Sequence, residues 1–96
     1  MKSLKPWLYN WCEITVHNSS QNADVLYDGF IVAASDTVVH LTDVQDVTYF
    51  LRWKQKALGG TYIFDYSGIK SAVVYRMVKD PDTDAMMKQI IFSCYQ

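Results

Sequence analysis

Residues 25–44, VLYDGFIVAASDTVVHLTDV, decide the fold of this 96-residue chain. Aliphatic β-branched and aromatic residues dominate the stretch, which favours strands. Asp28-Gly29 can make a two-residue hairpin turn, or the glycine can lie inside a sharply bent strand. We prefer the bend, because a turn at this point would leave only three residues for one hairpin arm. Ser35-Asp36 is the better turn, since a second strand resumes directly after it at residues 37–41 and closes at 43–46.

Strand-like segments continue on both sides of this stretch. Residues 12–17 alternate between apolar and polar, and a polar loop follows them at 18–24. The remaining predicted strands are 61–66 and 69–78, joined by a short turn at Ser67-Gly68, and 86–95, for which a C-terminal helix is the alternative.

Two further segments can adopt helix. Ser3 is a candidate cap for a short N-terminal helix with Leu4, Trp7, Leu8 and Trp11 on one face. Residues 47–58 have candidate caps at both ends, yet their residues alternate as in a strand. We expect strand in the first half of 47–58 and loop in the second. Together these elements predict a mainly β fold, a small, strongly bent barrel of five or six strands with a possible short N-terminal helix.

The composition narrows the class of protein. Half of the residues are apolar and 20% are charged, as in folded globular domains, and we assign residues 1–96 to a single domain. Nine Asp against one Glu favour turns over helices. The net charge of −1 excludes a strongly basic arm and a strongly acidic tail. Because the sequence shows neither a membrane-spanning stretch nor a signal-peptide pattern, we expect a cytoplasmic protein with reduced thiols.

Tyr27-Asp28-Gly29-Phe30-Ile31-Val32, then Asp36 and residues 38–44, resemble the first motif of the Sm-like fold, the small barrel of Sm, LSm and Hfq proteins. In that family a glycine bends the second strand and an Asp precedes the third. Residues 61–75, TYIFDYSGIKSAVVY, are similar in outline to the second motif. The resemblance implies an Sm-like, or otherwise SH3-like, barrel that assembles as a ring or dimer.

The groups with which that family binds RNA are not matched here. No Asn follows Asp36, where the chain continues with Thr37 and Val38. The turn at residues 65–68, DYSG, carries neither the Arg-Gly nor the Lys-His of RNA-binding members. The resemblance therefore does not imply binding of oligo-U RNA.

Fourteen aromatic residues are many for one small core. Tyr and Trp are enriched at the centres of protein interfaces, and an interface between copies of one chain is the simplest kind. Trp7 and Trp11 share a face whether their segment is helical or extended. We expect interface contacts from Trp7, Trp11, Tyr49 and Trp53, in a homo-oligomer or with a protein partner of unknown identity. The alternative is that these rings cap one end of the core.

Residues 52–56, RWKQK, favour a second function. The candidate nucleic-acid contacts are Arg52, Trp53, Lys54 and Lys56, because three cations surround an indole that can stack on a base. Phosphate neutralisation supplies most of the affinity of such proteins, so a chain with few cations would bind weakly and in a salt-dependent way. The alternative is a solvated strand edge, where lysines discourage pairing.

No residues suggest a catalytic or metal site. Cys12, His17, His40 and Cys94 lie much further apart than the ligand pairs of structural zinc sites. A Cys12–Cys94 disulfide is sterically possible but disfavoured in the cytoplasm. No strand–turn–helix nucleophile motif is present. We therefore expect no metal, no cofactor and no enzymatic activity, and we interpret the two cysteines as small buried apolar residues.

The sequence thus predicts a non-enzymatic binding or adaptor module that self-associates. One alternative is a weak RNA- or DNA-binding Sm-like protein that uses residues 52–56. Another alternative is a small inhibitor protein from a mobile element or phage. No residue pattern in the sequence argues for or against this alternative. Steep salt dependence of binding would favour the nucleic-acid alternative.

Overall fold

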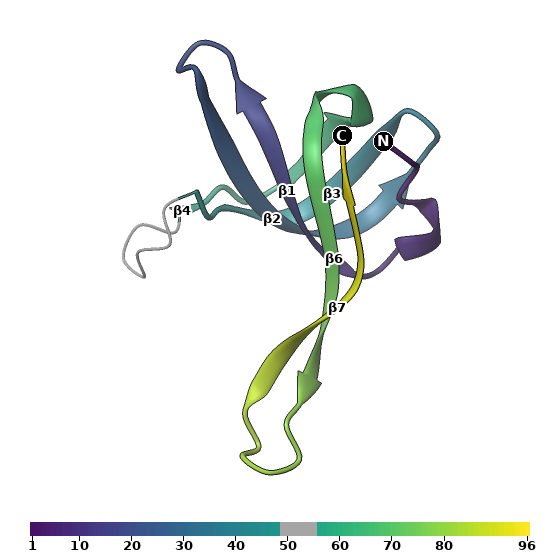
Figure 1. Cartoon of the computed structure of the whole chain (residues 1–96), viewed down its shortest axis with the longest axis vertical. Coiled ribbons are helices and arrows are strands. Elements are labelled where there is room, and N and C mark those ends of the chain that lie inside the picture. The colour runs from purple at the N-terminus through teal and green to yellow at the C-terminus, as the bar shows by residue number, and fades with distance from the viewer. Residues whose placement is uncertain (49–55) are drawn as a thin grey trace.

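The computed structural model describes residues 1–48 and 56–96, and in these ranges it contains seven strands and two single turns of 3-10 helix (Figure 1). The strands are β1 (Trp11–Asn18), β2 (Ala23–Ala34), β3 (Val38–Asp46), β4 (Lys56–Ala57), β5 (Thr61–Asp65), β6 (Ile69–Lys79) and β7 (Met86–Tyr95). The helical turns are η1 (Lys5–Trp7) and η2 (Tyr66–Gly68). The chain is mainly β, as the sequence predicts, and residues 86–95 form a strand and not a helix.

The described strands form one antiparallel sheet in the order β4–β3–β2–β1–β6–β7, and β5 pairs with β3 on the same edge as β4. Within the described ranges this sheet is open, whereas the sequence predicts a barrel. Closure would require the edge strands at the two ends of this order to pair, β7 with β5 or β4, and the described strands show no such pairing.

The bend in β2 lies at Gly29, inside one continuous strand, as the sequence predicts. Asp28 pairs with Gln45 and Phe30 pairs with Thr42, so two residues of β3 bulge opposite the glycine. The strand predicted at 37–41 therefore does not end there. It continues through the bulge as β3.

The core lies on one face of the sheet. Alternate residues of β1, β2 and β3 point into it, as the two-residue period of a strand requires. Its fully buried members are Leu4, Cys12, Ile14, Ile31, Val39, Leu41, Val44, Ile69, Ala72 and Val74. Trp7 and Phe92 pack at its border.

Tyr66 connects the N-terminal segment to the sheet. Its buried hydroxyl accepts a hydrogen bond from the Leu4 N–H and donates one to the Ser35 carbonyl. The distance between the heavy atoms is 3.0 Å in both bonds. The predicted N-terminal helix exists as the single turn η1, where Ser3 Oγ accepts a hydrogen bond from the Lys5 N–H. The chain leaves this turn at Tyr9, whose φ is 65°.

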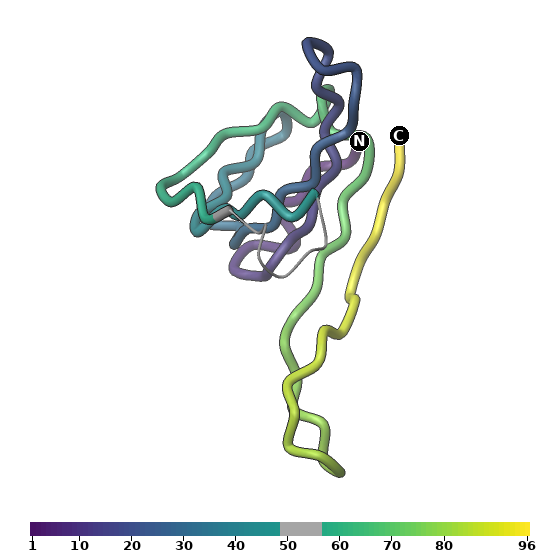
Figure 2. Tube along the Cα trace, turned by 90° about the vertical axis from the view of Figure 1, so that its left-hand side faces the viewer, coloured from purple at the N-terminus to yellow at the C-terminus, as the bar shows by residue number. Residues whose placement is uncertain are grey.

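Beyond the body of the sheet, β6 and β7 continue as a two-stranded arm, here defined as residues 76–90 (Figures 1 and 2). The ladder between β1 and β6 ends at the pair Trp11–Tyr75, so residues after Tyr75 pair with β7 alone. The register of β6 and β7 shifts at this same point, between Val74 and Tyr75. The arm accounts for the elongated outline of the molecule, which measures 44 × 32 × 25 Å.

The elements predicted at 47–58 lie mostly outside the described residues. At the start of this segment, Val47 and Thr48 are not in a strand. At its end, Lys56 and Ala57 form β4, where the sequence predicts loop.

Candidate functional site

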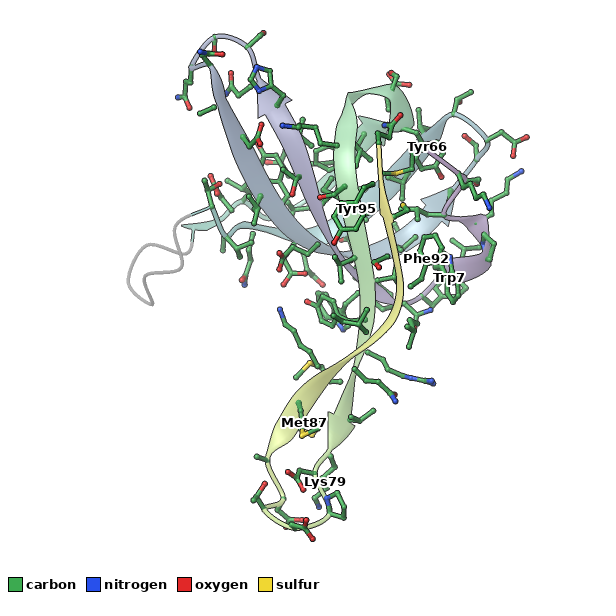
Figure 3. The ribbon with its side chains drawn as sticks, in the orientation of Figure 1. Trp7, Tyr66, Lys79, Met87, Phe92 and Tyr95 are labelled. Atoms are coloured by element: carbon green, nitrogen blue, oxygen red, sulfur yellow. The ribbon has the colours of Figure 1, made fainter. Side chains whose placement is uncertain are left out.

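The arm carries a group of exposed apolar side chains. Met77, Met86, Met87 and Ile90 are 42%, 59%, 47% and 64% exposed. Figure 3 shows Met87 and Lys79 on the projecting part of the hairpin, away from the body. These apolar side chains face solvent because no other described strand lies against this part of β6 and β7.

A free strand edge runs beside these side chains. Within the described ranges β7 pairs with β6 alone, so the outer edge of its ten residues has no partner strand. Lys88 is the one lysine or arginine of this strand, whereas natural proteins often protect such edges with several charges or a proline. The arm therefore offers backbone hydrogen-bonding groups and apolar side chains together.

The face of the sheet opposite the core, here called the outer face, holds two carboxylates side by side. Glu13 on β1 lies directly opposite Asp28 on β2, and like charges in that arrangement destabilise a sheet. Tyr75 reaches across β1 and donates its hydroxyl to both oxygens of Asp28, at 2.6 and 2.7 Å. Burial, together with the hydrogen bond to Asp28, raises the pKa of the Tyr75 phenol far above its usual range. The phenol therefore remains a proton donor to Asp28.

Lys88 supplies a cation to this face. Its ammonium lies 4.4 Å from the centre of the Tyr75 ring and 3.9 Å from Glu13 Oε2. An aromatic face and a carboxylate attract a cation together. Lys88 thus offsets the charge of Glu13, while the one described side chain bonded to Asp28 is the neutral Tyr75.

Two depressions flank Tyr75 on the outer face. The first has a volume of about 510 Å³ and is lined by Glu13, Val73, Tyr75, Lys88 and Ile90. The second has a volume of about 320 Å³ and is lined by Trp11, Asp28, Asp43, Gln45, Tyr75 and Met77. We call the second depression the acidic pocket. Asp43 belongs to the bulge of β3 and has a left-handed φ of 52°.

Trp7 and Trp11, two of the predicted interface residues, are half-buried in intramolecular contacts. Trp7 stacks on Phe92 with ring centres 4.9 Å apart, at the border of the core (Figure 3). Trp11 packs edge-on against Phe30 at 5.3 Å, on the outer face. The prediction that the two indoles share a face is wrong, because the chain turns at Tyr9 between them. Their role in an interface stays a prediction.

The other predicted site residues fall largely outside the described ranges. Tyr49, Arg52, Trp53 and Lys54 belong to the segment that the structure does not describe. Lys56 begins β4 and pairs with Asp46 of β3. The interface role of Tyr49 and Trp53 and the nucleic-acid role of residues 52–56 therefore stay predictions.

His17 is exposed, whereas Cys12 lies in the core and Cys94 packs against it. Cys12 and Cys94 are free thiols, and burial raises the pKa of Cys12 to about 12. His17 Nδ1 lies 3.1 Å from Asp24, which also accepts hydrogen bonds from Lys70, and the Lys70 and His17 contacts lower the pKa of that carboxyl. Across residues 1–48 and 56–96, no three His, Cys, Asp or Glu side chains are grouped so that they could hold a metal ion.

Comparison with known proteins gives no relative: no protein-family model, curated protein or solved structure matches this chain. In the described part of the chain no helix is long and apolar enough to cross a membrane. The arm and the outer face are therefore the features of the molecule from which we infer a function.

Sequence reasoning missed both of these features. It interpreted Asp28 as part of a bend and Tyr75 as an ordinary strand residue. Their contact depends on the placement of β1 between β2 and β6, and strand order is not visible in a single sequence. The arm had a local signal, since the predicted strands 69–78 and 86–95 are long and carry methionines near the loop that joins them.

Proposed function

We propose that this chain is a non-enzymatic binding module that self-associates through its arm. The observation that carries the proposal is a set of exposed apolar side chains beside the edge of β7, which has no partner strand within the described ranges. The register places Met77, Met86 and Ile90 on one face of the hairpin and Met87 on the other. Exposed apolar side chains that gather on one element of a small protein commonly mark an interaction site. An unpaired edge strand is a template for a strand from another chain.

We further propose that the body is Sm-like and that β7 with the arm is an addition to it. The bend at Gly29 and the order of the elements support this assignment. Because β7 covers the outer edge of β6, assembly at this end of the sheet would use the edge of β7.

The role of the arm is tested by size-exclusion chromatography of a double variant, Met86→Lys with Met87→Lys. We expect the unmodified chain to elute as an oligomer and the double variant to elute as a monomer, because lysine ammonium groups resist removal from water. The matched control is Ile63→Lys, which changes an apolar side chain, 62% exposed, on the edge strand β5 at the other end of the sheet.

The control is expected to elute with the unmodified chain. Dissociation by Ile63→Lys, with the arm variant still associated, would assign the interface to β5 and overturn the role of the arm. Monomeric elution of the unmodified chain would overturn self-association itself.

A further inference from the structure

We propose that the acidic pocket binds the arginine side chain of a protein partner, presented by an extended basic segment. This site goes beyond self-association and does not depend on it. The pocket combines two carboxylates, Asp28 and Asp43, with the apolar surfaces of Trp11, Tyr75 and Met77. It is an open depression of about 320 Å³, so a side chain can enter it from solvent.

The charge of the outer face is the first argument. In the described parts of the chain, neither Asp28 nor Asp43 forms an ion pair, while Glu13 has Lys88. Asp28 and Glu13 face each other across two strands, an arrangement of like charges that costs stability. A cation bound in the acidic pocket would offset this repulsion.

The Lys88 contact is the second argument, and it is independent of the carboxylates of the pocket. The Tyr75 ring already holds the Lys88 ammonium at 4.4 Å from its centre, with Glu13 as the anion. The acidic pocket lies against the same tyrosine and has Asp28 as the nearest equivalent of Glu13. The tyrosine that lines the acidic pocket therefore already accepts a cation beside a carboxylate within the chain itself.

The apolar walls favour arginine over lysine. A guanidinium is planar and weakly hydrated, stacks on aromatic faces and donates two parallel hydrogen bonds to a carboxylate. Tyr75 orients Asp28 to accept a guanidinium, because the Tyr75 hydroxyl donates to both carboxylate oxygens and holds the carboxylate in place. An ionised carboxylate has about four acceptor positions, so Asp28 can accept further donors.

The proposal is tested by NMR titration of the isotope-labelled full chain with three short acetylated peptides. Their sequences are Gly-Ser-Arg-Ser-Gly and the same peptide with lysine or with neutral citrulline at the centre. We expect saturable shifts of the Trp11 indole N–H and the Gln45 amide, strongest with arginine, weaker with lysine and absent with citrulline. Equal shifts with citrulline and arginine, or shifts confined to other residues, would overturn the proposal.

Two variants locate the binding. Asp43→Asn removes one carboxylate of the pocket and keeps a residue type that tolerates a left-handed φ, and we expect the peptide affinity to fall about twofold to fivefold, as for an exposed ion pair. Asp36→Asn is the matched control, because this carboxylate is 84% exposed and pairs with Lys5 away from the pocket. Equal weakening by both variants would show non-specific attraction and overturn the site.

A single-stranded oligonucleotide distinguishes the other class of partner. The carboxylates of the pocket repel phosphates, so we expect the Trp11 and Gln45 resonances to stay unmoved when the oligonucleotide replaces the peptide. Saturable shifts of these resonances by the oligonucleotide alone would overturn recognition of a cationic side chain.

Discussion

Gly29 and Gly68 have contrasting surroundings. A Cβ built on Gly29 would lie 3.0 Å from the Leu41 Cβ and 3.1 Å from the Thr42 carbonyl oxygen, whereas a Cβ on Gly68 would meet no atom within 4 Å. The close approach of β2 and β3 at the bend thus depends on the absence of a side chain at Gly29.

The first prediction concerns this contact. We expect Gly29→Ala to lower the free energy of unfolding by about 1–3 kcal/mol, because the added methyl group overpacks the core side of the bend. Gly68→Ala is expected to change it by less than about 0.5 kcal/mol. Urea denaturation of the two variants provides the measurement, and equal effects would show that close packing does not determine the bend.

The second prediction concerns the Cys12 thiol. Burial raises its pKa from 9.0 to about 12, so the folded state favours the neutral thiol. The resulting stabilisation is complete below pH 9 and is lost as the pH rises from 9 toward 12. At pH 8 we expect Cys12 to resist a thiol reagent in the folded protein, while the half-buried Cys94 reacts first.

Mass spectrometry after labelling measures this difference. The Cys94→Ala variant is expected to gain no label until denaturant is added. Rapid labelling of Cys12 in that folded variant would show that its thiol is accessible and would contradict its place in the core.

At the scale of elements, the parts that could be predicted are those with a local cause. The bend at Gly29 and the turn at Ser35-Asp36 follow from residues that interrupt an apolar stretch. The strands β5, β6 and β7 follow from alternation between glycine and aspartate breaks. β3 is longer than predicted because its bulge depends on packing against Gly29, which lies on another strand.

The open sheet and the acidic pocket have non-local causes. The described sheet stays open because its edge strands, β7 at one end and β4 and β5 at the other, do not pair with each other. The pocket depends on a hydrogen bond between Tyr75 and Asp28, which are 47 positions apart. Neither the β6–β7 pairing nor the Tyr75–Asp28 hydrogen bond is indicated by the neighbouring residues in the sequence. The sequence therefore predicts the strands but not which strands lie side by side.

The third prediction treats the arm as an element separable from the body. We expect replacement of residues 77–88 by Asn-Gly to leave a shorter hairpin, since Arg76 and Gln89 are cross-strand partners and can flank a two-residue turn. None of the removed residues belongs to the core, so the thermal unfolding midpoint should stay close to that of the unmodified chain. Circular dichroism during heating measures this midpoint.

The same replacement is expected to weaken self-association, because it removes three of the four exposed apolar side chains of the arm. Loss of the folded state would contradict the separation of arm and body. If the shortened chain folds stably and still self-associates as before, the interface lies on a surface other than the arm.

At the scale of the whole molecule, an elongated shape is combined with a net charge of only −1. Such a small net charge opposes the approach of a second copy very little. In our proposal the exposed apolar side chains of the arm are the surface at which copies meet. Met77 belongs both to this set and to the acidic pocket, so the two proposed surfaces adjoin.

The mass in solution tests this account most directly. Light scattering on a sizing column gives it for the unmodified chain, at several concentrations and at low and high salt. We predict a defined oligomer whose mass is a whole multiple of 11.1 kDa at both salts, because apolar contacts, unlike exposed ion pairs, are not screened. A mass of 11.1 kDa under every condition would contradict self-association through the arm.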